Sequence, residues 1–555
     1  MKKITITLLL LCILFLGGFL RFYKLGEAPI GLHRDEAFLG YNAYSLLKTG
    51  KDMNGIALPL HLKSFLYSPA GYSYASIPFI AAFGLNAFSV RFASALFGTL
   101  TILVTYFLVK ELYKRYNNYK DYNGYLALLS ALLLAVSPWH LNLSRTATEN
   151  TLAVFFITLG TLLYLLWHRN QHFIMLLASF VSFAISLFIY QAPRAFLPLF
   201  IPVLLLLYRT KSRLPFLFLF LTILFPLFLI FRSPALALRF QTVNLFSTEE
   251  TQLQIDEALR EDGVTSQPRI ITRAFHNKVI GYGQQFLQNY FSHFSYPFLF
   301  TDKGLPDRYR IPSRALLYLI ELPFLLAGLY ALFKNHKPYA WLLLTWIILA
   351  PIGSAIAFDD VPNLQRTLLI FPALSITVAL GFIQWFNWIS KINSIIRLPV
   401  YSFIGLLFIF GVTNYLHAYY VHQPVHRPWS RHEGYQALVA NINALLPDYQ
   451  KAIITDRQSA PTIFFLFFGT YDPAIFQAQT STSTFPDYDR IAFSNYEFSQ
   501  EECPLQQNKN DRGNTGKSGI LYVNFGTCKP VEGTKELEVI RRGDTSIVFR
   551  IITPL

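Results

Sequence analysis

Charged residues are scarce in this chain. Only 14% of its 555 residues are charged, whereas 53% are hydrophobic, and soluble domains carry about 25% charged residues. This composition excludes a single large soluble core and indicates a polytopic membrane protein. Acidic residues are fewer than basic residues, which gives the chain a formal net charge of +15. Because the basic residues cluster in short loops between apolar runs, the excess reflects membrane topology, and we expect no nucleic-acid partner.

Recognisable nucleotide motifs and cysteines are also few. Neither a GxGxxG nor a phosphate-loop pattern occurs, so soluble nucleotide chemistry is not supported. The chain has three cysteines, of which Cys12 lies in the first apolar run. Cys503 and Cys528 are candidates for a disulfide if the polar C-terminal region is extracytoplasmic. The first apolar run, residues 4–20, has no convincing cleavage site, so we expect an uncleaved anchor.

What the chain has in abundance is long apolar segments. About eleven are candidates to cross a bilayer, which takes roughly 20 residues each. They are residues 4–20, 88–109, 124–141, 147–167, 172–190, 192–208, 214–231, 314–333, 338–357, 367–386 and 400–421. Three prolines between residues 193 and 202 leave the boundary between the fifth and sixth segments uncertain.

Alternate loops between these segments are basic. They are residues 110–123, 168–171, 209–213, 334–337 and 387–397. Because positive loops stay in the cytoplasm, this pattern predicts a cytoplasmic N-terminus and an extracytoplasmic C-terminal region. We expect a multi-pass protein of a bacterial or archaeal plasma membrane, surrounded by membrane lipids.

Three predicted outer segments are long. Residues 21–87 contain a semi-apolar stretch expected to form a short interfacial helix, and residues 232–313 run from polar to aromatic. Residues 422–555 are predicted to form a small α/β domain after a membrane domain of residues 1–421. In that domain we expect a helix over 434–449 and strands over 452–456, 490–494, 519–525, 537–542 and 546–552, with a polar loop over 506–519.

Two adjacent carboxylates, Asp35 and Glu36, follow the first apolar run. Ionisable residues near hydrocarbon are costly and need a reason. One explanation is helix capping, with Asp35 capping a helix over residues 36–47 and Glu36 near its positive end. The other is catalysis, and the two are compatible because a cap can hold a catalytic carboxylate rigid.

Further polar groups come to the same side of the membrane from four other loops. They are Arg145 and Glu149, Tyr190 and Arg194, His293, and the group Asp359, Asp360, Gln365 and Arg366. Each has a simpler explanation. Arg145 and Glu149 have the spacing of a helix-surface ion pair, Arg194 and Arg366 could contact lipid headgroups, and Asp359–Asp360 could be a solvated turn. A lone histidine such as His293 favours a polar role over metal ligation.

The predicted site combines a carboxylate with several arginines, and it faces water on one side and the membrane on the other. Such a site suits a substrate that has a polar reactive group attached to a lipid. A polyprenyl-phosphate sugar is such a substrate. The carboxylate would accept a proton from an attacking hydroxyl, and arginine would stabilise the departing phosphate.

The sequence RFYKLGEAPIGLHRDEAFLGYNAYSLLKTGKDMNG, continued by LPLHLKSFLYSPAGYSYASIPFIAAFGLNAFSVRFASALFG, resembles membrane glycosyltransferases of the GT-C type. The resemblance is to the branch of protein O-mannosyltransferases and lipid A aminoarabinose transferases, which use dolichyl- or undecaprenyl-phosphate sugars. It extends well up to residue 110 and includes SRTATENT and FDDVPNLQRT, whereas residues 232–313 and the C-terminal domain match loosely.

The resemblance implies roles for individual residues. Asp35 takes the catalytic acidic position, and Glu36 completes the motif and would position the acceptor or a cation. By the same resemblance, Arg145, Glu149 and Arg366 would line the donor cavity. Independently of it, we expect Arg194 to help bind the donor phosphate, and Tyr190, His293, Asp359, Asp360 and Gln365 to line the cavity. Some GT-C enzymes need a divalent metal, so Asp35 and Glu36 are the candidate ligands if one binds here.

The predicted function is therefore transfer of a sugar from a polyprenyl phosphate to a hydroxyl acceptor on a protein, lipid or cell-surface glycan. Two alternatives stay open. One is a transporter or flippase for lipid-linked sugars, and the other is a non-catalytic assembly protein that binds envelope glycans. The sugar, the acceptor and the oligomeric state do not follow from the sequence.

Overall fold

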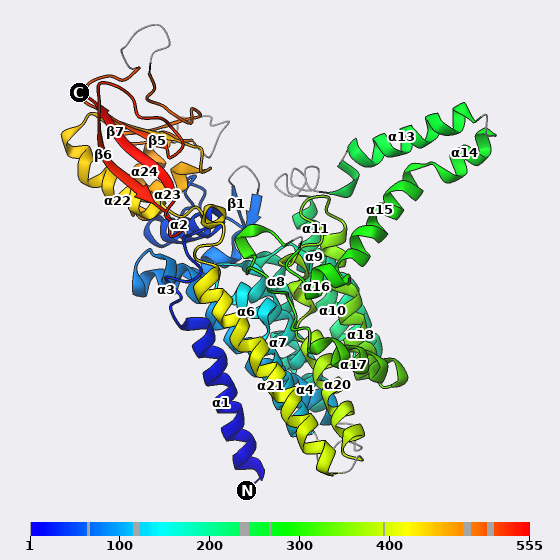
Figure 1. Ribbon diagram of the computed structural model, residues 1–555. Helices are drawn as coiled ribbons and strands as arrows, with labels where there is room; N and C mark the ends of the chain where they lie inside the picture. Colours follow the sequence, from blue (N-terminus) through cyan, green and yellow to red (C-terminus); the bar gives the residue numbers. More distant parts are fainter. Residues whose placement is uncertain are drawn as a thin grey trace.

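The computed structural model describes residues 2–63, 67–114, 123–232, 244–247, 249–265, 268–303, 305–391, 394–480, 490–507 and 515–555. A bundle of helices runs from the N-terminal end toward the C-terminal domain (Figure 1). Its members are α1 (Lys2–Phe22), α4 (Ala87–Lys114), α5 (Asn123–Val136), α6 (Pro138–Ser144), α7 (Glu149–Asn170), α8 (Phe173–Ile189), α9 (Ala192–Leu207), α10 (Leu214–Leu219), α11 (Phe225–Phe231), α17 (Glu321–Lys334), α18 (Pro338–Leu349), α20 (Ala373–Ile389) and α21 (Ser394–His417).

Each of the eleven predicted segments overlaps a helical part of this bundle. Among the described residues, six helices are long and apolar enough to cross a membrane, or seven if the bent pair α5–α6 is one span. Helices α8, α9 and α20 are apolar but shorter. The predicted segment 314–333 differs most, because its helix α17 begins only at Glu321.

A bend interrupts the third predicted segment. Helices α5 and α6 meet at 58°, because Pro138 lacks the N–H that would continue α5 and instead occupies the first turn of α6. The hydroxyl of Ser137 accepts the N–H of His140 and caps the new helix. The loop after α6 lies at the end of the bundle nearest the C-terminal domain (Figure 1).

Helices α17 and α20 pack at very close range. A Cβ on Gly328 would lie 1.9 Å from the carbonyl oxygen of Thr377, and one on Gly381 would lie 1.7 Å from that of Phe324. Only glycine fits at these two positions. Small residues that let two backbones approach are typical of helix contacts in membranes.

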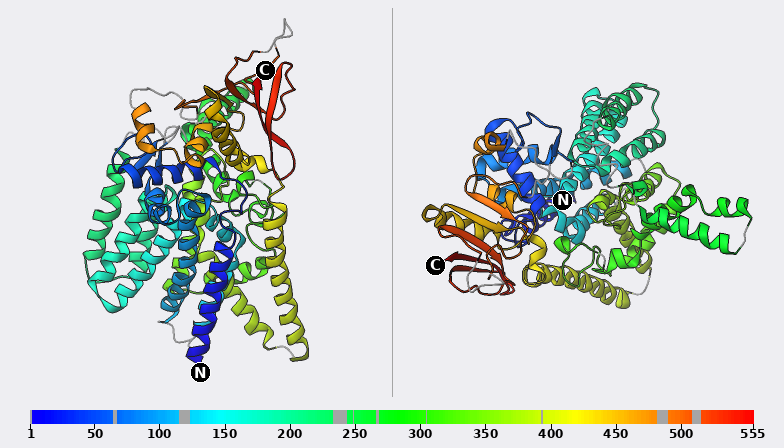
Figure 2. Two further views of the ribbon diagram at one scale, coloured as in Figure 1. Left: turned by 90° about the vertical axis from the view of Figure 1, so that its left-hand side faces the viewer. Right: turned by 90° about the horizontal axis from the view of Figure 1, so that it is seen from above.

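Two helices lie across the end of the bundle beneath the C-terminal domain (Figure 2). These are α2 (Arg34–Thr49) and α3 (Gly71–Phe83), the latter being the predicted short helix, with the small hairpin β1 (His61–Lys63) and β2 (Tyr67–Pro69) between them. Helix α2 contacts the C-terminal domain directly. The hydroxyl of Tyr41 donates to the carbonyl oxygen of Tyr471 at 3.0 Å, and Nε2 of Gln477 donates to the hydroxyl of Ser45 at 3.0 Å.

The C-terminal domain is a five-stranded mixed sheet with strand order β4-β3-β5-β7-β6. Its strands are β3 (Lys451–Thr455), β4 (Tyr496–Ser499), β5 (Ile520–Phe525), β6 (Thr534–Arg541) and β7 (Ile547–Pro554), and its helices are α22 (Tyr435–Leu445), α23 (Pro461–Phe468) and α24 (Pro473–Thr480). Strand β3 is parallel to both β4 and β5, whereas β7 is antiparallel to both β5 and β6. A disulfide joins Cys503 to Cys528.

One strand prediction in this domain is wrong. Residues 490–494 are not a strand, and β4 begins at Tyr496 instead. Pairing with β3 determines which residues form the neighbouring strand, since Tyr496 lies opposite Ala452. Phe493 instead packs its ring against Phe476 at 5.4 Å between centroids. Part of the predicted polar loop 506–519 lies outside the described residues.

The second long outer segment forms a helical arm that projects away from the bundle (Figure 1). The arm consists of α13 (Glu249–Val264), α14 (Arg269–Phe275) and α15 (Lys278–Ser292), and the short helix α16 (Tyr296–Phe300) follows at its base.

Candidate active site

A cavity of about 670 Å³ lies where α2, loops at the adjoining end of the bundle and the C-terminal domain meet. It gathers eight of the residues that the sequence singled out: Asp35, Glu36, Glu149, Tyr190, Asp359, Asp360, Gln365 and Arg366. Segments far apart in the chain therefore converge on one space. Arg145, Arg194 and His293 are not among its lining residues.

The first turn of α2 is fixed by a reciprocal cap. Nδ1 of His33 accepts the N–H of Asp35 at 3.3 Å, and the Glu36 carboxylate accepts the N–H of His33 at 3.1 Å. This is a capping box in which histidine takes the place usually held by serine or threonine. The cap is thus His33 and not Asp35, so the Asp35 side chain is left for another use.

Glu36 is buried in a network of positive charge. Its side chain is 4% exposed, and its Oε1 accepts Nε of Arg91 at 2.9 Å. Arg431, which follows the last membrane helix, also donates to the carboxylate, as does the N–H of Ala147 at 2.9 Å. Burial alone would raise the pKa of Glu36, but Arg91 and Arg431 outweigh burial and hold that pKa at about 2.

The same two arginines bind the chain between α1 and α2. Arg91 donates to the carbonyl oxygens of Leu25 and Pro29 at 3.1 and 3.0 Å, and Arg431 donates to that of Ile30 at 3.1 Å. Glu36 therefore holds together the approach to α2, the bundle and the C-terminal region. Its carboxylate reaches the edge of the cavity but is 4% exposed, and both of its oxygens are taken by these hydrogen bonds.

Asp35 has the opposite environment. Its side chain is 59% exposed and lies at the cavity. Crowding by protein opposes ionisation, but His33, Arg308 and Arg34 outweigh it and lower the pKa of Asp35 below its ordinary value of 3.8. The cavity thus holds an accessible carboxylate that is ionised at neutral pH.

Two arginines supply positive charge on the cavity wall. Arg366 is held by Asp359, through its carbonyl oxygen at 2.8 Å and its carboxylate at 2.9 Å. Arg308 lies 3.4 Å from the Asp360 carboxylate, and its Nε has no hydrogen-bond partner among the described residues. That Nε is buried, whereas the Arg308 side chain as a whole is 30% exposed and brings positive charge to the cavity wall.

Arg145 serves the structure rather than the cavity wall. Its guanidinium donates to the carbonyl oxygens of Leu20, Tyr23 and Ala28 at 2.6, 2.7 and 3.0 Å. Its Nε donates to the hydroxyl of Tyr419 at 3.1 Å. Arg145 is 1% exposed and ties the end of α1 to the end of the last membrane helix.

Arg194 and His293 are likewise buried beside the cavity. Nε of Arg194 donates to the carbonyl oxygen of Leu187 at 2.9 Å. Nε2 of His293 lies 2.8 Å from the hydroxyl of Ser354 and 3.2 Å from the N–H of Asn363. His293 thereby positions the loop that carries Arg366. Burial lowers the pKa of His293 to about 4, so it is neutral there.

Sequence reasoning missed several residues at this site. Arg91, Arg308 and Arg431 were not singled out, nor was His432, which lines the cavity from the C-terminal side. Arg91 offered a signal, because an arginine near the start of the apolar segment 88–109 needs a buried partner. Arg308 and Arg431 lie in polar stretches where arginine is ordinary, so their positions follow only from the tertiary structure.

The carboxylate pair is not arranged as a metal site. In the part of the chain that the structure describes, no group of three or more His, Cys, Asp or Glu side chains is placed to hold a metal ion. Both oxygens of Glu36 already accept hydrogen bonds from arginine or backbone. Asp35 and Glu36 therefore do not present a shared pair of free ligands.

Comparison with known sequences matches part of the chain. Residues 57–224 match the family model described as dolichyl-phosphate-mannose-protein mannosyltransferase. An uncharacterized protein of Aquifex aeolicus is 29% identical over 186 residues, and the match spans 33% of this chain and 33% of that protein. The chain thus matches about a third of the length of this curated relative.

Comparison with solved structures extends over the whole chain. The crystal structure of apo ArnT from Cupriavidus metallidurans superposes with a TM-score of 0.52 at 10% identity, covering 99% of this chain and 98% of that one. The structure of the same protein bound to undecaprenyl phosphate gives a TM-score of 0.51 at 12% identity, with the same coverage. The apo oligosaccharyltransferase of Archaeoglobus fulgidus gives 0.51 at 14% identity, covering 84% of this chain and 64% of that one.

These likenesses establish the fold. The protein is a polytopic membrane protein with the GT-C architecture, a helical bundle joined to a small C-terminal α/β domain. The fold class predicted from the sequence is confirmed.

Proposed function

We propose that this protein is a membrane glycosyltransferase that moves one sugar from a polyprenyl-phosphate donor to a hydroxyl acceptor at the extracytoplasmic face. The observation that carries the proposal is the exposed Asp35 carboxylate in a cavity that also holds Arg308 and Arg366. That cavity lies at one end of an apolar bundle. There the tail of a lipid-linked donor would stay beside the bundle while its polar headgroup enters the cavity. The match to mannosyltransferases and the fold shared with ArnT support it.

Asp35 would act as the base. The acceptor hydroxyl gives its proton to an oxygen of Asp35 while its own oxygen attacks the anomeric carbon of the sugar. The bond from that carbon to the phosphate oxygen breaks, and its electron pair leaves with the polyprenyl phosphate. One such displacement inverts the configuration at the anomeric carbon. Because the phosphate leaves as an anion, the reaction needs no general acid.

Arg308 and Arg366 would hold the phosphate. Arg366 is preorganised by Asp359, and Arg308 brings a partly exposed guanidinium to the cavity. Fixed positive charge near the departing phosphate stabilises the transition state by about 3–4 kcal/mol per well-placed group. Arg145 and Arg194, which the sequence proposed as helpers, would contribute by holding the cavity walls.

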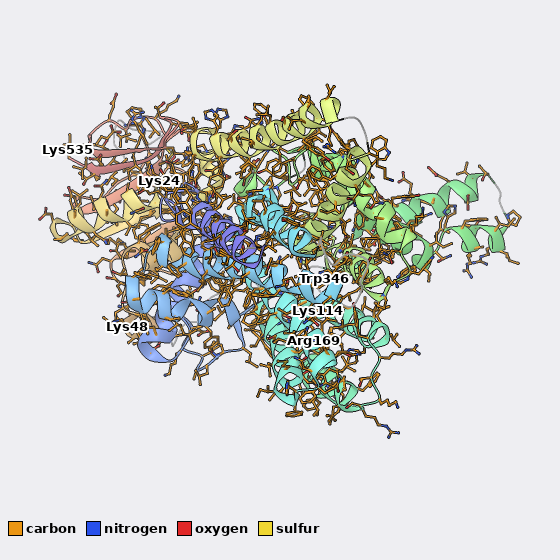
Figure 3. The ribbon with its side chains drawn as sticks, turned by 90° about the horizontal axis from the view of Figure 1, so that it is seen from below. Lys24, Lys48, Lys114, Arg169, Trp346 and Lys535 are labelled. Atoms are coloured by element: carbon orange, nitrogen blue, oxygen red, sulfur yellow. A yellow bond between two sulfur atoms is a disulfide. The ribbon has the colours of Figure 1, made fainter. Side chains whose placement is uncertain are left out.

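The distribution of basic residues supports the proposed orientation. Figure 3 views the end of the bundle opposite the C-terminal domain and shows Lys114 and Arg169 near each other on that end. They belong to the last turns of α4 and α7. Positive charge at this end supports a cytoplasmic location for it, and the cavity and the C-terminal domain would then lie outside.

The test is release of free polyprenyl phosphate by the purified protein from a panel of radiolabelled polyprenyl-phosphate sugars, with a cell-envelope extract as the source of acceptor. We expect release from one donor of the panel, together with label in the extract. Heat-inactivated protein is the control. Tight donor binding without release, with passage of the donor across a proteoliposome membrane, would instead indicate a flippase.

His33→Asn is expected to move the acid limb of the pH–rate profile to higher pH. The charge of His33 and its hydrogen bond to Asp35 are main causes that lower the pKa of Asp35. Removing that charge raises the pKa of Asp35, so Asp35 is protonated and inactive at a higher pH than in the wild type. Asparagine also caps helices well, so α2 keeps its start.

The measurement is polyprenyl phosphate release as a function of pH for the wild type, His33→Asn and His33→Ala. His33→Ala removes both the charge and the cap, so it should share the pH shift and also lose thermal stability. Superimposable profiles for all three proteins would contradict the assignment of Asp35 as the titrating base.

A further inference from the structure

A second cavity, of about 270 Å³, lies in the C-terminal domain at the carboxyl ends of β3 and β4. The chain leaves β3, returns in β4 on one side of it, and then crosses to β5 on the other side. In open sheets, ligands bind outside the carboxyl ends of parallel strands where the strand order reverses in this way. The order reverses between β3 and β5, and the cavity lies beside that point, at the carboxyl ends of β3 and β4.

Its lining is polar and balanced in charge. Asp456 follows β3 and forms an ion pair with Arg490. Arg457 lies 3.9 Å from the carboxylate of Glu502. Two acids and two bases thus line one small space. Glu502 is held in place by its neighbour Cys503, which is disulfide-bonded to Cys528.

This second cavity adjoins the first. Ser459 and Ala460 line both. Both residues have left-handed backbone conformations, with φ of 70° and 47°, which is uncommon for residues with a Cβ and is found at functional sites. Nη1 of Arg34, the neighbour of Asp35, donates to the hydroxyl of Ser459 at 3.1 Å. The segment 459–460 therefore connects the surroundings of Asp35 to the sheet.

We propose that the second cavity is an acceptor subsite that binds a neutral, hydroxyl-rich portion of the acceptor, a carbohydrate, whose reacting hydroxyl extends past Ser459 to Asp35. This proposal rests on the proposed function and adds the chemical class of the acceptor.

Charge balance decides the class of ligand. Two carboxylates and two guanidiniums leave no net charge to attract an ionic ligand, whereas they present many donors and acceptors side by side. A sugar ring carries hydroxyls that both donate and accept, so it can satisfy such a set. With the acceptor in the second cavity, Arg308 and Arg366 in the first cavity remain available for the donor phosphate.

The test uses the full-length protein with Arg457→Gln and Glu502→Gln combined. The two side chains are 62% and 40% exposed, so the double change keeps both the net charge and the fold. The matched control combines Lys451→Gln with Glu497→Gln, an exposed ion pair of 2.7 Å on the same two strands outside both cavities. Each protein is assayed for label transferred to the envelope extract and for polyprenyl phosphate released to water without extract.

We expect the double variant to lose transfer about tenfold or more, as the loss of a few hydrogen bonds to the acceptor predicts. Its release to water should equal that of the wild type, and the control pair should match the wild type in both assays. Equal transfer by the double variant and the wild type, or equal loss in the control pair, would overturn the proposal.

A binding measurement separates this proposal from the proposed function. Maltotriose, mannotriose and chitotriose are tested by saturation-transfer NMR against the wild type, the double variant and the control pair. Binding of at least one trisaccharide that only the double variant loses would support the subsite, even if no donor were ever cleaved. No trisaccharide signal, with binding of a serine-containing peptide library instead, would overturn it in favour of a peptide acceptor.

Discussion

Asp35→Asn is expected to slow polyprenyl phosphate release by about 10²–10⁴-fold, the range that a positioned general base contributes. Asparagine keeps the size and the hydrogen-bonding shape of the side chain but accepts no proton. Because Asp35 is 59% exposed and is not the helix cap, the protein should fold and bind the donor as before. The effect should therefore fall on kcat, with little change in the KM for the donor.

The measurement compares the initial rate of release by purified wild type and Asp35→Asn, with donor affinity measured separately by equilibrium binding. Asp35→Glu is the matched variant, because it keeps the carboxylate but displaces it by one methylene. We expect Asp35→Glu to retain more activity than Asp35→Asn. Full activity of Asp35→Asn at normal protein levels would refute the role of Asp35.

Glu36→Gln is expected to destabilise the protein by about 3–5 kcal/mol, as happens when one partner of a buried ion pair is removed. Glutamine leaves Arg91 and Arg431 facing each other without the carboxylate that separates them. The stabilisation by Glu36 is present above its unfolded pKa of about 4.5 and is lost only as the pH falls toward about 2. At neutral pH the loss in Glu36→Gln is therefore complete.

The measurement is the fraction of detergent-solubilised protein that stays monodisperse after heating, for wild type, Glu36→Gln and Asp35→Asn at one pH. We expect Glu36→Gln to aggregate at a markedly lower temperature, whereas the neighbouring Asp35→Asn should follow the wild type. Adding Arg431→Gln to Glu36→Gln removes one of the uncompensated charges and should restore part of the stability. Equal heat resistance of Glu36→Gln and the wild type would contradict the structural role of Glu36.

The contrast between these two carboxylates shows where sequence reasoning ends. Successive residues of a helix point about 100° apart, so of two adjacent acids one faces the cavity and one the interior. Which is which depends on Arg91 and Arg431, which lie 55 and 395 residues away from Glu36 in the chain. The sequence therefore identifies the pair of carboxylates, but it does not show that Asp35 is exposed in the cavity while Glu36 is buried among arginines.

The membrane segments were predictable because their signal is local. Length and hydropathy within one segment suffice to mark a span, and each predicted segment overlaps a helix. The strand predicted over residues 490–494 failed for the opposite reason. Its alternation suits a strand, yet pairing with β3 selects residues 496–499 instead. Arg145 is a similar case, since its partners are carbonyl oxygens at the end of α1 that no local pattern identifies.

The buried contact between Glu36 and Arg431 also orders events during synthesis. Ribosomes make proteins from the N-terminus at about 5–20 residues per second, so about 20–80 s separate the two partners. Until Arg431 has been translated, Glu36 on α2 has only one of its two arginines, and the cavity wall formed by His432 and Ser459 is missing. An unfinished chain therefore has no complete cavity around Asp35 until the residues up to Ile463 have been made.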